Sequence, residues 1–240
     1  MQIIAIRPEP ALSETLTLAP EFDLPVQGIA LSRAMACDWT APDPENFDAI
    51  LAGSANVFRH GGDELAQLTS LPVLAVGAKT AEAATKAGFA VQMTGEGGLQ
   101  ALVDTLGQSP CRLLRLSARD HVRLTWPKHI TAQTCIVYEM EQLDISQAQA
   151  ERLRDPAIIL LYSASSAAHF RQQCVRLGIN IGQITIAALG PRIAEAAGDG
   201  WASVHASEKP TEAELLALAK SLWQLKPNAP SGGGAEDQKN

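Results

Sequence analysis

The chain has 240 residues, of which 46% are hydrophobic and 19% charged, enough apolar side chains for two cores of ordinary size. Its formal net charge of −7 argues against a nucleic-acid partner, because phosphate binding requires a positive surface. The aromatic content of only 5% favours helices packed on buried strands over a β-sandwich.

The N-terminus, MQIIAIRPEP, lacks the charged and apolar regions of a secretory signal, and the longest apolar runs are too short to cross a bilayer. We therefore expect a cytoplasmic protein with no membrane segment. The four cysteines include no C-x-x-C pair, which is typical of reduced thiols. The five histidines show no metal-ligand spacing, so no metal site is predicted.

The first half of the chain is predicted to begin with a strand at residues 3–6, followed by a short helix with Ser13 as its N-cap. A second strand is expected at 25–32, and the proline-rich turn 41–44 indicates a boundary. Strands and helices then alternate. Strands are expected at 49–52, 73–76, 112–116 and 136–138, and helices at 54–68, 80–86 and 99–106.

The second half repeats this alternation up to a polar tail. Strands are expected at 158–161 and 185–189, and helices at 163–177, 193–197 and 212–223, the last capped by Thr211. The low-complexity segment 227–240 is predicted to be disordered, since it cannot bury apolar surface. Strands that alternate with helices predict parallel sheets covered on both faces.

One strand–Ser–helix, strand–Gly–helix unit occurs twice. Residues 75–84 and 188–197 share six of ten identical positions, at an offset of 113. Residues 49–55 match 158–164 in hydrophobic pattern, at an offset of 109. Two copies with so long a period suggest a duplicated domain.

The repeated residues lie where a parallel sheet binds ligands. Ser54 and Ser163 directly follow buried strands, where a serine can cap a helix whose free N–H groups attract anions. Gly77 and Gly190 follow the next strands and let a ligand approach the backbone. The pattern favours a site for a polyanionic small molecule, although ordinary caps and turns account for the same residues.

Short motifs occur in a fixed order along residues 2–223, in which they resemble those of the uroporphyrinogen-III synthases, enzymes that cyclise linear hydroxymethylbilane. The motifs are a strand ending in Arg7-Pro8, F-D-x-I…S-A-N-V (47–57), A-V-G-x-x-T-A (75–81), L-R-x-x-x-x-R (114–119), V-Y (137–138), S-A-S (163–165) and A-x-G-P (188–191).

This resemblance implies a duplicated, flavodoxin-like α/β fold of two parallel-sheet domains joined by a two-stranded connector. Residues 1–33 would join 140–226 in one domain, and 36–137 would form the other, with 227–240 as a tail. The repeat alone would have divided the chain once, near its middle. The resemblance also implies an active site in the cleft between the domains.

The implied reaction is loss of hydroxide from hydroxymethylbilane, followed by ring closure through a spiro intermediate that inverts the last pyrrole. The enzyme chiefly holds one substrate conformation, so no metal or organic cofactor is implied. The expected protein is a monomer, with a transient contact to the preceding deaminase as a further expectation.

The same resemblance implies roles for individual residues. Tyr138 matches a tyrosine that faces the cleft and could assist the departing hydroxide, although a structural hydrogen bond is the alternative. Thr80 could donate to a substrate carboxylate, whereas Arg192-Ile193 replaces the threonine that is common in the second copy. The remaining expected substrate-binding residues are Arg7, Arg115 and Arg119 as carboxylate partners, and Ser54, Ala55, Asn56, Gly77, Ser163, Ala164, Ser165, Gly190 and Arg192 at strand ends and helix starts.

Two other interpretations remain open at the level of sequence. A two-lobed α/β protein could close around an anionic metabolite without chemistry, and a divergent, inactive relative could serve as a partner or scaffold. The isomer formed from hydroxymethylbilane distinguishes these alternatives from the enzyme.

Overall fold

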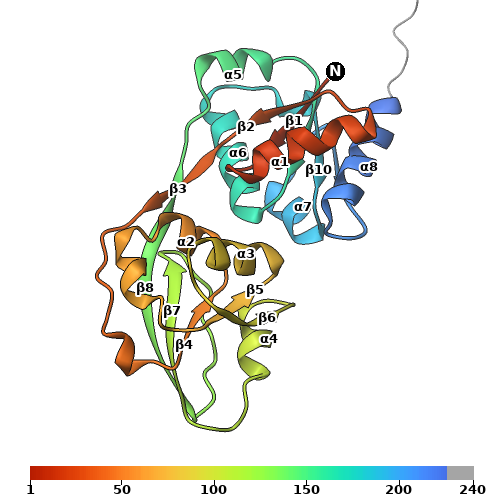
Figure 1. The fold of residues 1–240 in the computed structure, drawn as a ribbon. Helices are drawn as coiled ribbons and strands as arrows, with labels where there is room; N and C mark the ends of the chain where they lie inside the picture. The colour runs from red at the N-terminus through yellow and green to blue at the C-terminus, as the bar shows by residue number, and fades with distance from the viewer. Residues whose placement is uncertain (226–240) are drawn as a thin grey trace, which may run out of the picture. The chain divides into compact units, whose positions relative to one another are not determined.

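The structure, a computed structural model, describes residues 1–225 (Figure 1). The predicted tail at 227–240 lies outside the described residues. The chain forms two compact α/β units. Unit 1 combines Met1–Ser32 with the chain from Gln142 onward, and unit 2 is Arg33–Glu141, so the chain passes between the units twice.

Unit 2 contains a six-stranded sheet with the order β3-β8-β7-β4-β5-β6. The five strands from β4 to β8 pair in parallel. β3 lies at the edge beside β8, where the N–H of Cys37 donates to the carbonyl of Val137. The strand bounds are β3 Ser32–Ala36, β4 Ala49–Ala52, β5 Val73–Val76, β6 Val91–Gly95, β7 Cys111–Ala118 and β8 Ile130–Gln142.

Helices cover both faces of this sheet. On one face, α2 (Asn56–His60) and α3 (Ala78–Lys86) pack on the inward side chains of β4, β5 and β7. On the other face, Leu102 and Val103 of α4 (Leu99–Asp104) pack on a second buried cluster. Burial on both faces accounts for the continuous apolar runs Ala49–Ala52 and Val73–Val76.

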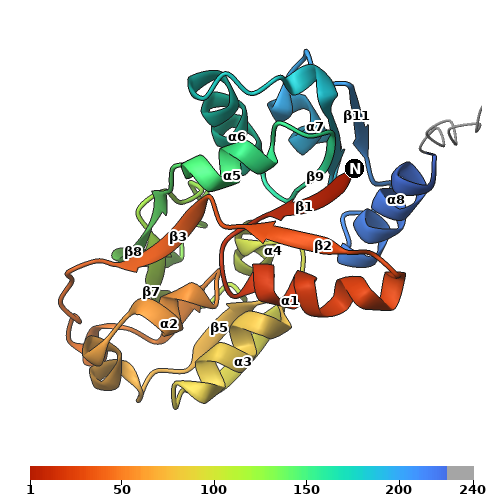
Figure 2. The ribbon, with the colours of Figure 1, turned by 90° about the horizontal axis from the view of Figure 1, so that it is seen from above.

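Unit 1 contains a five-stranded, wholly parallel sheet with the order β11-β10-β9-β1-β2. Helices α5, α6 and α7 cover one face, while α1 and α8 cover the other, as Figure 2 shows. The strand bounds are β1 Gln2–Ile6, β2 Val26–Ile29, β9 Ala157–Leu161, β10 Ile184–Ala188 and β11 Ser203–Ala206. The helix bounds are α1 Ala11–Leu18, α5 Gln147–Arg152, α6 Ala164–Arg176, α7 Pro191–Ala197 and α8 Glu212–Gln224.

The two sheets have the same plan with a different chain order. In unit 2, β4, β5 and β6 run outward on one side of β4, and β7 and β8 lie on its other side. In unit 1, β9, β10 and β11 run outward in the same way, but β1 and β2 from the N-terminus fill the places of β7 and β8. Each sheet therefore has a switch point, between β4 and β7 or between β9 and β1, and such a point is where open α/β sheets bind ligands.

Some predicted elements were wrong in their bounds. The helix expected at 54–68 ends at His60, and after Gly61-Gly62 a 3-10 helix follows at Asp63–Leu68. Gly62 has φ +64°, a conformation that interrupts a helix. Ser13 lies inside α1, whose N-cap is Pro10, and the strand expected at 25–32 divides into β2 and β3.

Three elements had no prediction from the sequence: β6, β11 and α5. Both strands are sheet edges with mostly exposed or half-buried side chains, so they lack a continuous apolar run. α5 has only six residues and begins with a capping box at Ser146 and Gln149. The remaining 3-10 helices are Ala19–Phe22, Pro44–Asn46 and Ile181–Gln183.

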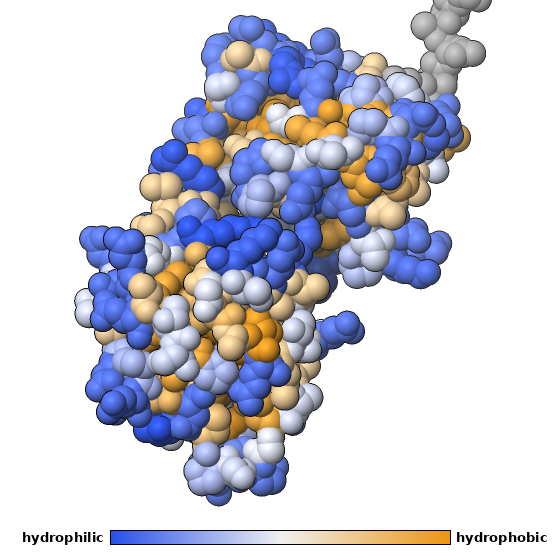
Figure 3. Space-filling view, viewed as in Figure 1, coloured by the Kyte–Doolittle hydropathy of each residue, from blue (hydrophilic) through white to orange (hydrophobic). Residues whose placement is uncertain are grey.

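The surface carries no large apolar patch on the face in Figure 3, where hydrophobic side chains form small groups among hydrophilic ones. Val122, Val175 and Leu225 are the most exposed large hydrophobic residues that the structure describes, and they are distant from one another in sequence. Between residues 1 and 225, no helix combines the length and the apolar character needed to cross a membrane.

Candidate functional site

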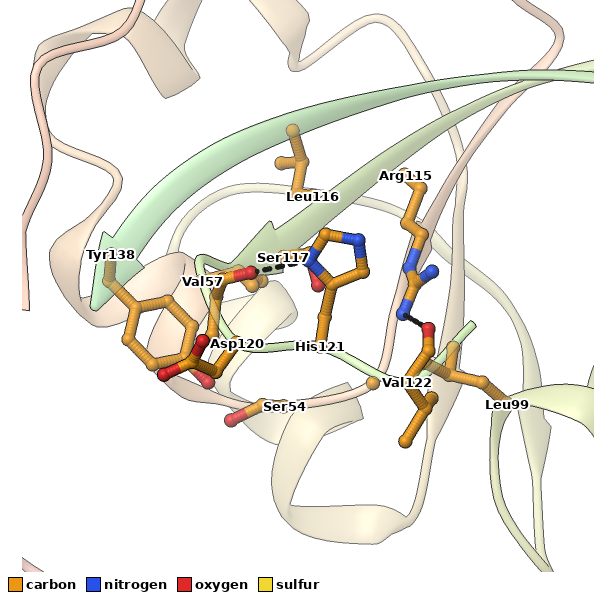
Figure 4. A pocket seen from close by; sticks show the side chains of 12 residues that line it. Ser54, Val57, Leu99, Arg115, Leu116, Ser117, Asp120, His121, Val122 and Tyr138 are labelled. Carbon is orange, nitrogen blue, oxygen red and sulfur yellow. Dashed lines mark hydrogen bonds between the residues drawn. The ribbon is translucent and has the colours of Figure 1, made fainter. Parts of the chain in front are cut away.

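A pocket of about 150 Å³ opens at the switch point of unit 2, at the carboxyl ends of β4 and β7 (Figure 4). We call it the Arg115 pocket. Its volume suits one carboxylate-bearing arm of a ligand, since sites that enclose a whole small molecule are several times larger. It is lined by Gly53, Ser54, Val57, Leu99, Arg115, Leu116, Ser117, Ala118, Asp120, His121, Val122 and Tyr138.

Arg115 is the dominant charge of this pocket. It lies on β7, is 3% exposed, and donates from Nη2 to the carbonyl of Val122 at 2.9 Å. Its Nε has no partner, and it forms no ion pair with any residue among 1–225. Burial lowers the pKa of Arg115, which still keeps its charge. A buried cation without a counter-ion is costly, so an anion that enters the pocket gains a strong partner.

Tyr138 forms another wall of the pocket. It lies on β8 with 7% exposure, and its ring centroid is 6.2 Å from that of His60. Burial, followed by the charge of Arg59, lowers the pKa of His60, so this imidazole tends to be neutral. The expected catalytic residue and Arg115 therefore line the same small pocket.

His121, Ser117 and Asp120 also line the pocket and were missed at the sequence level. Nδ1 of His121 lies 2.8 Å from the carbonyl oxygen of Ala118 and 3.1 Å from that of Arg119. These residues end β7 or follow it, directly beside the L-R-x-x-x-x-R motif. Their place after a buried strand was the available signal, but histidine and serine have no distinctive spacing there.

The other expected residues of unit 2 lie near the same sheet edge without all joining the pocket. The hydroxyl of Ser54 accepts from the N–H of Asn56 at 3.2 Å, in a turn that precedes α2. The N-cap of α2 is Ala55, not the predicted Ser54, and a helix of five residues is too short to supply a strong N-terminal dipole. Gly77, at φ +78°, precedes α3, where Thr80 is only 4% exposed.

The Arg119 side chain does not line the Arg115 pocket and forms other contacts. Its Nε donates to Oε2 of Glu139 at 2.5 Å, and its Nη2 donates to Sγ of Cys37 at 3.5 Å. More than half of the Arg119 side chain is exposed. Arg119 therefore forms an exposed ion pair within the protein.

In unit 1, a hollow of about 440 Å³ lies at the ends of β9 and β10. Four of the expected residues line it together: Ser163, Ala164, Gly190 and Arg192. Ser163 caps the 13-residue α6, as predicted, by accepting from the N–H of Ser166 at 3.1 Å. Ser165 does not line this hollow, and its hydroxyl accepts from Gln142 at 3.3 Å. The other lining residues are Leu189, Pro191, Ile193 and Pro210.

Arg7 follows β1 at the switch point of unit 1, but its partners come from the protein itself. Its Nη1 donates to Oε2 of Glu212 at 2.5 Å and to Oγ1 of Thr15 at 2.9 Å, and its guanidinium lies 4.0 Å from the Tyr162 ring centroid. Oε1 of Glu212 accepts from Thr15 at 2.8 Å and from the Tyr162 hydroxyl at 2.7 Å. Burial, and then the nearby Glu212, raise the pKa of Tyr162. No motif in the sequence had indicated that Glu212 would form an ion pair with Arg7.

Metal binding finds no support in the described part of the chain, where no group of three or more histidine, cysteine or acidic residues is arranged to hold an ion. The four free cysteines lie separately, with Cys37 just after β3 and the others on β7, β8 and α6. Each of the two hollows offers a cationic group and hydrogen-bonding groups at the edge of its own sheet, and such groups suit a carboxylate.

Comparison with known proteins agrees with this architecture. A search of curated proteins finds no match. A crystal structure of uroporphyrinogen-III synthetase from Helicobacter pylori 26695 superposes with a TM-score of 0.65 at 18% identity, covering 92% of this chain and 100% of that one. A mutant uroporphyrinogen III synthase from the extremely thermophilic bacterium Thermus thermophilus matches at 16% identity with a TM-score of 0.47, covering 93% of this chain and 100% of that one.

The Helicobacter pylori structure shows that the fold is shared, while the sequence carries the assignment to a family. The family model described as uroporphyrinogen-III synthase HemD matches residues 22–217, well over half of the chain. This match includes the Arg115 pocket and the hollow at Ser163. The resemblance of the motifs is thereby confirmed, and the chain belongs to the uroporphyrinogen-III synthase family.

Proposed function

We propose that the chain is an active uroporphyrinogen-III synthase that converts hydroxymethylbilane into uroporphyrinogen III and water. The enzyme is cytoplasmic and monomeric, uses no cofactor and receives its labile substrate through transient contact with the preceding deaminase. The observation that carries the proposal is that Tyr138 and the uncompensated Arg115 line one pocket at the switch point of a sheet.

The substrate fits the chemistry of both sheet edges, because it is a flexible chain of four pyrroles with several carboxylates. Arg115 binds one carboxylate in the pocket of unit 2, where a buried charge gives a strong interaction. In unit 1 taken by itself, Arg192 and the N–H groups at the start of α6 offer groups of the same kind to a carboxylate. Arg192 takes the place of the hydroxyl donor that Ile193 cannot supply.

The chemical step needs little from the protein. The pyrrole nitrogen pushes out hydroxide, and Tyr138 donates a hydrogen bond to the departing oxygen. The bound carboxylates hold the last ring so that its substituted carbon is attacked, which leads to the spiro intermediate and inversion. Catalysis therefore comes from stabilising one folded transition state of the substrate over its spontaneous, uninverted closure.

The test is the isomer that forms when freshly generated hydroxymethylbilane is supplied by the deaminase. Rapid production of isomer III, measured by chromatography of the oxidised porphyrins, is expected. Isomer I at the spontaneous rate would refute the enzymatic function and favour a non-catalytic binding protein. A protein heated beyond its unfolding transition serves as the control for the spontaneous reaction.

A further inference from the structure

We propose that Glu212 is a positioning residue, which fixes one wall of the hollow of unit 1 through a short strap at residues 208–211. Pro210 of this strap lines the hollow, and Glu212 follows it two residues later, at the start of α8. This role rests on the proposed function, because it assumes that part of the substrate enters the hollow. Neither the motifs nor the repeat had indicated Glu212.

The strap has little of its own to hold it in place. All four of its residues are exposed, and they lie between the end of β11 at Ala206 and the start of α8. The hydrogen bond described within it joins the N–H of Thr211 to the carbonyl of Lys209 at 2.8 Å. A segment that buries so little surface is held where its two ends are anchored.

Ser207 anchors the strap at its beginning. Ser207 is buried, and its N–H donates to the carbonyl of Ala188 on β10 at 2.9 Å. Its hydroxyl lies 2.8 Å from the carbonyl oxygen of Leu189, which lines the hollow, and 2.9 Å from that of Lys209 in the strap. The hydroxyl can donate to either oxygen, so it ties the strap to the end of β10.

Glu212 anchors the strap at its other end, and both of its carboxylate oxygens are occupied. Oε2 accepts from Arg7 at 2.5 Å, while Oε1 accepts from the hydroxyls of Thr15 at 2.8 Å and Tyr162 at 2.7 Å. Thr15 is fully buried, and Arg7 also donates to it, so the partners of Glu212 are themselves fixed. Hydrogen bonds to a charged carboxylate are strong, so this anchor resists displacement.

The same contacts connect two segments that line the hollow. Tyr162 directly precedes Ser163, which is the N-cap of α6 and a lining residue. The hydrogen bond from Tyr162 to Glu212 therefore joins the start of α6 to the strap that carries Pro210. A displaced strap would change the shape of the hollow while leaving its cation, Arg192, in place.

The first test compares Glu212→Ala with Glu214→Ala, a matched control in the same turn of α8. At a temperature well below the unfolding of both variants, Glu212→Ala is expected to raise KM for hydroxymethylbilane about tenfold and to change kcat less than about twofold. The reason is that a misshapen hollow loses binding that substrate and transition state share. Glu214→Ala is expected to keep both constants. A purely structural Glu212 would lower the melting temperature and leave KM unchanged.

Acetate separates the anchor from the charge that it neutralises. Acetate can take the place of the missing carboxylate in Glu212→Ala and pair with Arg7, but it is not joined to the strap. Added acetate is therefore expected to raise the melting temperature of Glu212→Ala while KM stays high. Recovery of KM by acetate would mean that only the charge of Arg7 needs a partner, and would overturn the positioning role.

Two controls accompany the acetate experiment. The wild type receives the same acetate, which measures any competition with the substrate for its own sites. The double variant Arg7→Met/Glu212→Ala is expected to show no rise in melting temperature, because acetate has lost its cationic partner.

Hydrogen exchange observes the strap without the reaction. The N–H groups of Ser207 and Thr211 are hydrogen-bonded and report on the two ends of the strap. Exchange in a peptide that spans residues 206–212 is expected to be about tenfold faster in Glu212→Ala than in Glu214→Ala, and acetate is expected not to slow it. Equal rates in the two variants would refute the anchor.

Ser207→Ala tests the other anchor and decides the question should Glu212→Ala fail to fold. It leaves the pair of Arg7 and Glu212 intact and is expected to raise KM by about threefold to tenfold, as for the loss of one hydrogen bond. Isomer III formation with an unchanged KM in either folded variant would overturn the positioning role and leave the enzyme. Formation of isomer I alone would refute the proposed function, while hydrogen exchange would still report whether Glu212 holds the strap.

Discussion

Two arginines near the carboxyl edges of the two sheets have opposite surroundings. Arg7 in unit 1 is paired with Glu212 at 2.5 Å, whereas Arg115 in unit 2 has a carbonyl partner and a free Nε. Both were expected to bind substrate, and only the charge left uncompensated by the protein is ready for a ligand. The value of an arginine as a binding residue thus depends on which carboxylates the fold brings to it.

Arg115→Met is expected to raise the stability of the protein and to weaken its binding of substrate. The change removes a buried, unpaired charge, which outweighs the lost hydrogen bond to Val122, so the free energy of unfolding should rise by about 1 kcal/mol. KM for hydroxymethylbilane should rise at least about tenfold. Urea denaturation followed by circular dichroism, together with steady-state kinetics, measures both effects. A less stable variant would mean that the guanidinium is structurally compensated.

Tyr138→Phe is expected to slow turnover without unfolding the protein. The ring is buried against β4–β8 side chains and keeps its packing when only the hydroxyl is removed. We expect kcat to fall by about a hundredfold, the lower end of the range of one general-acid contribution, with an unchanged melting temperature. An unchanged kcat would mean that positioning alone accounts for catalysis.

At the scale of elements, a carboxylate at the start of α8 closes the switch point of unit 1. Glu212 is the first residue of α8, and it binds Arg7 after β1, Thr15 of α1 and Tyr162 after β9. Four elements therefore meet on one side chain. The equivalent edge of unit 2 has no such carboxylate at Arg115 among the described residues, which makes the two copies of the repeat unequal.

Glu212→Gln is expected to destabilise unit 1 by about 1–2 kcal/mol, because the amide cannot match the charge of Arg7. Glu214→Gln, in the same first turn of α8, is the matched control and should cost only a few tenths of a kcal/mol through the helix dipole. Thermal unfolding of both variants measures the difference. Equal losses of stability in the two variants would show that Glu212 stabilises unit 1 only through its place at the helix start, and not through its contact with Arg7.

Asp48 lies just before β4 and bonds to Arg112 on β7. This contact makes the stability of the protein depend on pH. The Asp48 carboxylate accepts from the Arg112 side chain at 2.8 Å and from the Arg112 backbone N–H at 2.7 Å, which lowers the pKa of Asp48. A lowered folded pKa gives stability that is present above the unfolded value of about 3.9 and is lost as the pH falls through the folded value. Asp48→Asn should therefore melt lower than the wild type at pH 7, and the gap should narrow by about pH 3. A difference in melting temperature that stays the same from about pH 7 to about pH 3 would contradict this link between the Asp48 pKa and stability.

At the scale of the whole molecule, the chain order of the two units predicts different folding behaviour. Unit 2 is continuous, Arg33–Glu141, and contains its own two clusters of buried residues. Unit 1 places β1, from the N-terminus, between β9 and β2. Without residues 1–32, β9 would expose an apolar sheet edge.

Residues 33–141 expressed alone are therefore expected to fold, with cooperative thermal unfolding and dispersed NMR signals. Residues 142–225 alone should aggregate or remain unfolded, and addition of residues 1–32 should restore structure. A well-folded 142–225 fragment would show that β1 is dispensable for the sheet.

Much of the fold could be predicted because its central elements are buried on both faces. The runs at 49–52, 73–76 and 158–161 are typical of parallel strands covered on both faces, and Ser163 and Thr211 cap α6 and α8 as expected. The edge strands β6 and β11 could not be predicted, since half-exposed strands carry no continuous apolar signal. The break at Gly61-Gly62 was missed because the hydrophobic pattern continues beyond it.

The family, the two α/β units and the residue types at the strand ends follow from the sequence alone. They do so because hydrophobic runs and local motifs are properties of neighbouring residues. Which charges are compensated became known only from the folded protein: Glu212 reaches Arg7 across 205 residues, while Arg115 shares its pocket with Tyr138 and His121. Electrostatic pairing depends on distance and burial in three dimensions, and neither quantity is encoded in local spacing.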